Sequence, residues 1–124
     1  MKKLLLFISV ITIALLLAAC GSSSPKNVTD NYYKALQKGD YEKALSYTTV
    51  KDDDEEIKKE VEKMKSLEMD IKDYEIVSET ISEDGQTAEV EVKYNFTSSF
   101  NSEPKESTNT VKLEKLNGKW KIKG

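Results

Sequence analysis

Two stretches of this sequence carry residue types whose spacing could support chemistry, and the first is a run of acids from Asp52 to Glu56. Such a density of carboxylates suggests a cation site. However, successive helical residues point roughly 100° apart, so these carboxylates would diverge, and the run lacks the alternate spacing and the glycine of a calcium loop. Acids in the first turn of a helix complement the helix dipole. We therefore favour a helix start, and we predict no metal site and no cofactor.

The second stretch is Leu17-Ala18-Ala19-Cys20, which contains the only cysteine of the chain. Lys2 and Lys3 form a positive N-terminal region ahead of it. Residues 4–19 form an apolar run that is shorter than the roughly 20 residues a membrane-spanning helix needs. A cleaved signal is therefore favoured over a permanent membrane-spanning anchor.

This arrangement resembles the lipobox of bacterial lipoproteins. The resemblance implies that residues 1–19 are a signal peptide, that cleavage falls between Ala19 and Cys20, and that the Cys20 thiol receives a diacylglycerol carrying fatty acids such as palmitate. Two acyl chains hold a protein on a membrane, whereas a single chain binds only reversibly. We therefore expect a protein anchored through Cys20 to the extracytoplasmic face of the cell membrane. Residues 20–25 would be the lipidated cysteine and a flexible tether, and residues 26–124 a single domain.

The charge of the chain excludes several classes of function. Its formal net charge is −3, and it becomes more negative if Lys2 and Lys3 are removed. An acidic balance argues against nucleic-acid binding. The sequence contains no arginine and no histidine, so it lacks the bidentate phosphate clamp and the side chain that titrates near neutral pH. With one cysteine there is no disulfide within the chain, so packing must stabilise the fold.

The first half of the domain is predicted to be helical. An apolar stripe with helical spacing predicts a first helix from Lys26, capped by Asn27 and ended by Gly39. Asp40 is expected to cap a short second helix. Residues 52–67 form an amphipathic third helix with a narrow apolar stripe.

From Ile71 the apolar period changes to two, which predicts strands. Residues 71–81 have a mixed pattern that indicates a bulge. Residues 87–97 alternate most regularly, and the strand would bend around the helices if it continues to Phe100. Residues 101–105 are expected to be a polar loop before a third strand over residues 106–116. Asn117-Gly118 is a strong signal for a two-residue hairpin.

That hairpin sets the register of the last strand. It would pair Lys115 with Trp120, Leu113 with Ile122 and Glu114 with Lys121, which places Trp120 in the core. The lysines of this strand would point outward. Two interpretations of these lysines stay open. They could contact anionic lipids or wall polymers, or they could protect a strand edge against association, which is the interpretation we favour. They are Lys119, Lys121 and Lys123.

The expected architecture is α+β, with three N-terminal helices packed on a curved four-stranded antiparallel sheet. The segment from Tyr32 to Tyr47, with its Gly39-Asp40 turn, and the ending Asn117 to Ile122 resemble the nuclear transport factor two-like superfamily. More narrowly, they are similar to small Gram-positive lipoproteins of unknown function. The resemblance implies a cone, in which a bent sheet wraps around a long helix and often leaves a pocket. The implied pocket lining is Tyr32, Tyr33, Tyr74, Tyr94 and Trp120.

Fold alone does not select a function within that superfamily. Its enzymes place an acid inside the apolar cone, often with tyrosine or histidine, yet the core face of the strand over residues 87–100 carries no acid. We therefore assign no catalytic residue and expect a non-catalytic module that binds a ligand or an envelope protein, both unidentified. One alternative is a small lyase, isomerase or cyclase acting on an apolar ligand in the cone. Another is a structural envelope protein that forms a homodimer through the sheet.

Overall fold

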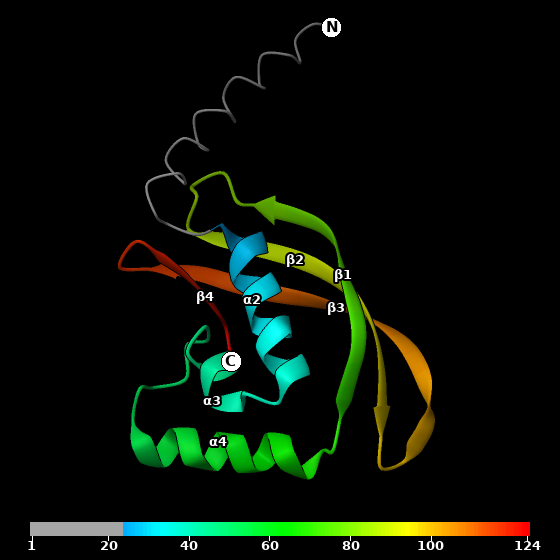
Figure 1. The fold of residues 1–124 in the computed structure, drawn as a ribbon. Helices are drawn as coiled ribbons and strands as arrows, with labels where there is room; N and C mark the ends of the chain where they lie inside the picture. Colours follow the sequence, from blue (N-terminus) through cyan, green and yellow to red (C-terminus); the bar gives the residue numbers. More distant parts are fainter. Residues whose placement is uncertain (1–23) are drawn as a thin grey trace, which may run out of the picture.

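The computed structural model describes residues 24–124, so the predicted signal peptide and Cys20 lie outside the described residues. Three helices precede four strands, which form one antiparallel sheet in the order β1-β2-β3-β4. Figure 1 shows the sheet curving around α2, with α4 crossing the bottom of the view. The elements are α2 (Pro25–Lys38), α3 (Tyr41–Leu45), α4 (Asp54–Ser66), β1 (Asp70–Ile81), β2 (Thr87–Ser98), β3 (Asn101–Leu116) and β4 (Lys119–Ile122). The predicted α+β class and the curved four-stranded antiparallel sheet are confirmed, but the prediction that all three helices pack on the sheet is wrong, because only α2 lies against it while α3 packs on α2 and α4 on α3.

Local capping residues fix the ends of α2. The prediction that Asn27 caps this helix is wrong, because the Ser24 hydroxyl accepts the Asn27 backbone N–H at 3.1 Å and Pro25 occupies the first helical position. Proline is suited to that position because its φ is preset and the missing N–H would have no helical partner. The predicted stop at Gly39 is confirmed, since this residue has φ 75°. Asp40 caps α3 as predicted, accepting the Lys43 N–H at 3.3 Å.

The acidic run forms the start of α4, two residues later than predicted. The Asp53 carboxylate caps the helix by accepting the N–H groups of Glu55 and Glu56 at 2.9 and 3.4 Å. The acids that follow complement the helix dipole. Within residues 24–124, no three histidine, cysteine or acidic side chains gather where a metal ion could sit.

The long strands explain the curvature of the sheet. The predicted bulge in β1 is confirmed, because the pairing with β2 shifts after Ile71 and again after Ile76. The predicted loop over residues 101–105 is wrong, since β3 already begins at Asn101 and Lys105 pairs with Phe96 of β2. Backbone pairing needs no apolar side chain, so a polar segment continues the strand once β2 lies beside it.

The β3–β4 hairpin has the predicted register, with Lys115 opposite Trp120. The Lys115 ammonium lies 5.3 Å from the centre of the Trp120 ring. The outer edge of β4 is covered, because Ile122 exchanges backbone hydrogen bonds of 2.8 Å with Tyr47 and Thr49. The lysines of β4 therefore do not protect a free strand edge.

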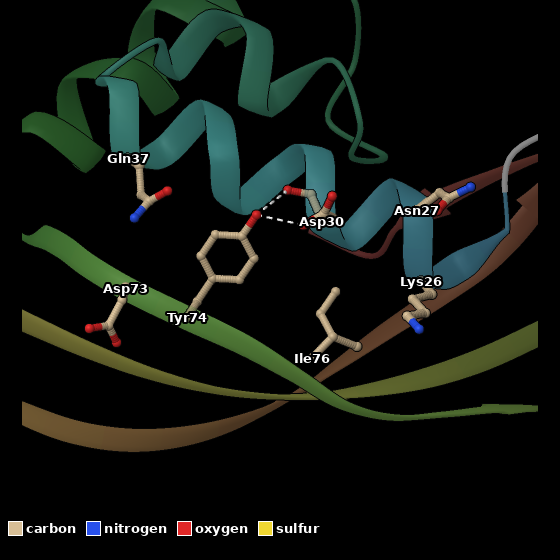
Figure 2. Close-up of a pocket in the computed structure, with 7 residues that line it drawn as sticks. All are labelled: Lys26, Asn27, Asp30, Gln37, Asp73, Tyr74 and Ile76. Carbon is tan, nitrogen blue, oxygen red and sulfur yellow. Dashed lines mark hydrogen bonds between the residues drawn. The ribbon is translucent and has the colours of Figure 1, made fainter.

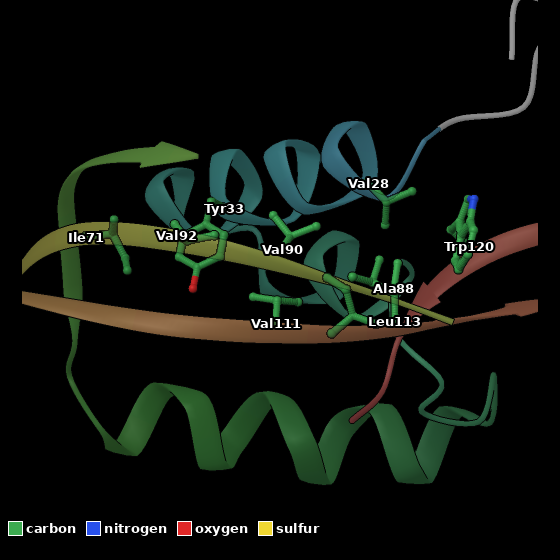
Figure 3. Packing of buried hydrophobic residues seen from close by; sticks show 10 residues of the cluster. Val28, Tyr33, Ile71, Ala88, Val90, Val92, Val111, Leu113 and Trp120 are labelled. Carbon is green, nitrogen blue, oxygen red and sulfur yellow. The ribbon is translucent and has the colours of Figure 1, made fainter. Parts of the chain in front are cut away.

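The core lies between α2 and the inner face of the sheet (Figure 3). Val90 and Val92 of β2 have no exposed surface, and Leu113 of β3 is 1 % exposed. Trp120, 8 % exposed, lies at one end of this cluster and Ile71 at the other. Side chains therefore fill the cone where α2 packs on the sheet, and any site must lie beside this packed layer.

Candidate functional site

A groove of about 590 Å³ separates α2 from β1, the first edge strand of the sheet (Figure 2). One wall is the polar side of α2, and the other is β1, whose Tyr74 and Ile76 side chains point toward the helix. Charged and amide groups from both elements border it, so its lining suits a polar ligand. The residues that line this α2–β1 groove are Lys26, Asn27, Asp30, Gln37, Asp73, Tyr74 and Ile76.

A hydrogen bond between Tyr74 and Asp30 crosses the middle of the groove. The Tyr74 hydroxyl donates to Asp30 Oδ1 at 2.5 Å and lies 3.2 Å from the Asp30 backbone oxygen. The other carboxylate oxygen of Asp30 is 3.3 Å from the Lys34 ammonium, one turn along α2. Burial raises the pKa of Tyr74, and the hydrogen bond to the Asp30 carboxylate raises it further. Tyr74 is therefore a fixed, protonated donor at neutral pH.

Further contacts hold α2 against β1 at both ends of the groove. At the N-terminal end of α2, the Lys26 backbone N–H donates to the Glu79 carboxylate at 2.9 Å. At the C-terminal end, the Gln37 side-chain amide donates to the Lys72 backbone oxygen at 3.0 Å. These contacts fix the width of the groove. They also leave it open along its length, where the Lys26 ammonium can donate hydrogen bonds. The Asp30 carboxylate is paired with Tyr74 and Lys34, but it is 37% exposed and each oxygen keeps a second lone pair.

Three of the predicted tyrosines come together behind the groove. Tyr33 is buried, and its ring centre lies 5.4 Å from that of Tyr74 and 5.9 Å from that of Tyr94. The Tyr33 hydroxyl accepts a hydrogen bond from the Asn109 amide at 3.2 Å. Burial raises the pKa of Tyr33, which the Asn109 hydrogen bond partly offsets. Of the three, only Tyr74 lines the groove, and Tyr33 and Tyr94 support it from the core.

The remaining predicted site residues lie elsewhere. Tyr32 contacts the ring of Tyr33 edge-on at 5.6 Å but lines a separate hollow beside β3. Trp120 is part of the core under the hairpin. Cys20 lies outside the described residues.

Asp30 was missed by sequence reasoning. Its spacing from Lys34 indicates an ion pair on the helix surface, but its bond to Tyr74 joins residues 44 positions apart. Nothing in the local pattern points to that contact.

The groove presents hydrogen-bond donors and acceptors of both charges, an arrangement that can bind and orient a polar ligand. The sequence has no histidine, and the described residues include no cysteine. The Asp30 carboxylate at the centre of the groove already accepts a hydrogen bond from the Tyr74 hydroxyl and forms an ion pair with Lys34.

None of the described helices combines the length and apolar character needed to cross a membrane.

The fold belongs to the NTF2-like class, as solved structures show. A ketosteroid isomerase-like protein from Erwinia carotovora atroseptica is 15% identical, with a TM-score of 0.56 over 78% of this chain and 86% of that one. A Campylobacter jejuni protein provisionally named an NTF2-like transpeptidase is 23% identical, with a TM-score of 0.56 over 82% and 99%. A SEC-C motif containing protein from Rhodopseudomonas palustris is 20% identical, with a TM-score of 0.64 over 88% and 83%.

Within that class, the chain belongs to the family described as domain of unknown function DUF4878, which matches residues 18–123. No curated protein matches the sequence.

Proposed function

We propose that this protein is a lipid-anchored, extracytoplasmic member of the bacterial cell envelope, whose domain is a non-catalytic module that binds a small polar ligand in the α2–β1 groove. The observation that carries this proposal is the groove itself, about 590 Å³ in volume and bordered by Asp30 and Lys26 of α2 and by Tyr74 of β1. That volume lies in the range of small-molecule sites. The names of the fold neighbours, which include a ketosteroid isomerase-like protein, fit a fold that accommodates small ligands.

The filled cone favours binding over catalysis. Val90, Val92 and Leu113 fill the space between α2 and the sheet, and none of them titrates. The Asp30 carboxylate is already engaged, since it accepts the Tyr74 hydroxyl and lies 3.3 Å from the Lys34 ammonium.

Binding is tested by NMR titration of ¹⁵N-labelled residues 24–124, which contain all described elements. The probes are N-acetylglucosamine, a disaccharide of it, spermidine and alanyl-alanine. We expect one of these classes to shift the backbone amides of Lys26, Asp30 and Ile76. Asp30→Asn should weaken that binding about tenfold, because it removes a charge-assisted hydrogen bond.

The matched control is Asp52→Asn, which removes the same charge from an exposed residue outside the groove. Equal weakening by both variants would show that only net charge matters. Shifts confined to residues outside the groove, or chemical conversion of a bound probe, would contradict the proposal.

The anchor is tested in cells by Cys20→Ala. We expect this variant to lose incorporation of radiolabelled palmitate and to leave the membrane fraction, because the thiol is the proposed attachment point. Ser22→Ala is the control and should keep both properties. Continued labelling of the Cys20→Ala protein would overturn the lipoprotein proposal without affecting the groove.

A further inference from the structure

Part of the outer edge of β3 has no neighbouring strand. On one side, β2 pairs with β3 from Asn101 to Glu114. On the other side, β4 pairs only with Leu113 to Leu116, and the last hydrogen bond there runs from the Lys123 N–H to the Lys112 oxygen at 2.8 Å. No described strand lies beside β3 beyond that bond. We call residues 105–111 on this side the open edge of β3.

The hydrogen-bond pattern identifies which backbone groups face the open edge. Lys115 directs its N–H to Gln86 on the β2 side, whereas Lys112 directs its oxygen to β4. Since these directions alternate along an antiparallel strand, Glu106, Thr108 and Thr110 point both N–H and C=O toward the open edge. These groups are a template for another strand. The template ends at Pro104, which has no N–H.

A hollow of about 380 Å³ lies beside this edge, on the opposite side of α2 from the groove. It is bordered by the Tyr32 ring, which is half-buried, and by the buried side chains of Val111 and Ile122. Lys112 and Lys123 are exposed at one end of it. A strand that continued the line of β4 would therefore have its N-terminal end beside two positive charges and would pass from there over an apolar floor.

We propose that the open edge of β3 and this hollow form a docking site for an extended segment of a partner polypeptide. The segment adds to the sheet as a strand, inserts an apolar side chain beside Tyr32 and places a carboxylate near Lys112 and Lys123. Backbone hydrogen bonds supply affinity in this mode, while side-chain pockets and charges supply specificity. The lysine pair is the reason for assigning an acidic segment. The site is separate from the α2–β1 groove and does not depend on the function proposed for it.

The middle of the edge, from Ser107 to Val111, lacks the features that usually prevent such addition, which are confined to Pro104, Lys105 and Glu106 at its end. Natural sheets protect edges with short strands, inward-pointing charges, bulges or proline. Here Thr108 and Thr110 occupy the middle of the edge, and threonine favours extended structure. Thr108 and Thr110 also pair regularly with β2, without a bulge.

The experiment measures fluorescence anisotropy of a labelled peptide with the full chain in mild detergent. The probe is a six-residue peptide that begins with an N-acetylated glutamate and continues with alternating valine and threonine, because a strand antiparallel to β3 has its N-terminal end beside Lys112 and Lys123. Thr108→Pro removes one outward N–H, so we expect at least tenfold weaker binding. The matched control Thr108→Val keeps that N–H and should bind as the wild type does. Unchanged melting temperatures would show that both variants fold.

A second variant tests the charge assignment without altering the edge backbone. Lys123→Glu should weaken binding of this glutamate probe about fivefold and should strengthen binding of a probe that begins with an N-acetylated lysine instead. Lys58→Glu, on α4, should change neither. Equal effects of Thr108→Pro and Thr108→Val, or no binding of either probe to the wild type, would overturn the proposal. Concentration-dependent dimerisation that Thr108→Pro abolishes would instead assign the edge to a second copy and would also overturn it.

Discussion

Replacing Trp120 with alanine should lower the free energy of unfolding by about 3 to 5 kcal/mol, the range for truncating a large buried aromatic side chain. Trp120 is 8 % exposed and belongs to the main core cluster, so almost the whole ring contributes. Its position at the end of that cluster lets the surroundings relax partly, which favours the lower half of the range.

The Lys115 ammonium over the ring adds a smaller contribution. Lys115→Met keeps the aliphatic packing and removes the charge, so it should cost about 0.5 to 1 kcal/mol. Comparing the two variants separates burial of the ring from its interaction with the cation.

Both variants are measured by urea unfolding of residues 24–124, followed by circular dichroism. Fluorescence is unsuitable because Trp120 is the only tryptophan. With a urea dependence of about 2 kcal/mol per molar, the Trp120→Ala midpoint should fall by about 2 M. A midpoint within about 0.2 M of the wild type at an unchanged slope would refute the assignment of Trp120 to the core.

Three further variants test local features of the fold. Tyr74→Phe should lower the free energy of unfolding by about 1 kcal/mol near neutral pH. Because the folded protein raises the pKa of Tyr74 above its ordinary 10.0, this stability difference from the wild type should be full below about pH 10 and shrink above it. A difference that stays constant up to about pH 11 in urea titrations would contradict this reasoning. Gly39→Ala should lower stability by about 1 kcal/mol through its positive φ alone, since no atom lies within 4 Å of the added Cβ, and Gly39→Asn should lose less in the same assay. Thr29→Val should raise the free energy of unfolding by about 1 kcal/mol, because the fully buried Thr29 hydroxyl has no hydrogen-bond partner among the described residues. A lower urea midpoint than that of the wild type would count against this reasoning.

The sequence by itself determined the features that depend on a few neighbouring residues. Gly39 ends α2 because only a residue tolerant of positive φ fits there, and Asn117-Gly118 fixes the β3–β4 register for the same reason. The prediction that Asn27 caps α2 is wrong even within this local range, because Ser24, three residues earlier, is an equally good capping residue and accepts the Asn27 N–H.

Only the tertiary structure decided which distant segments meet. The segment 101–105 becomes a strand because β2 lies beside it, and the edge of β4 is covered because residues 47–49 return to it. The Tyr74 bond to Asp30 likewise depends on how α2 packs across the sheet. Local patterns fix backbone geometry over one turn or one hairpin, whereas these contacts join residues far apart in the chain. Burial of the shared core selects which distant residues become neighbours. The groove and the open edge of β3 therefore could not be predicted from the sequence alone.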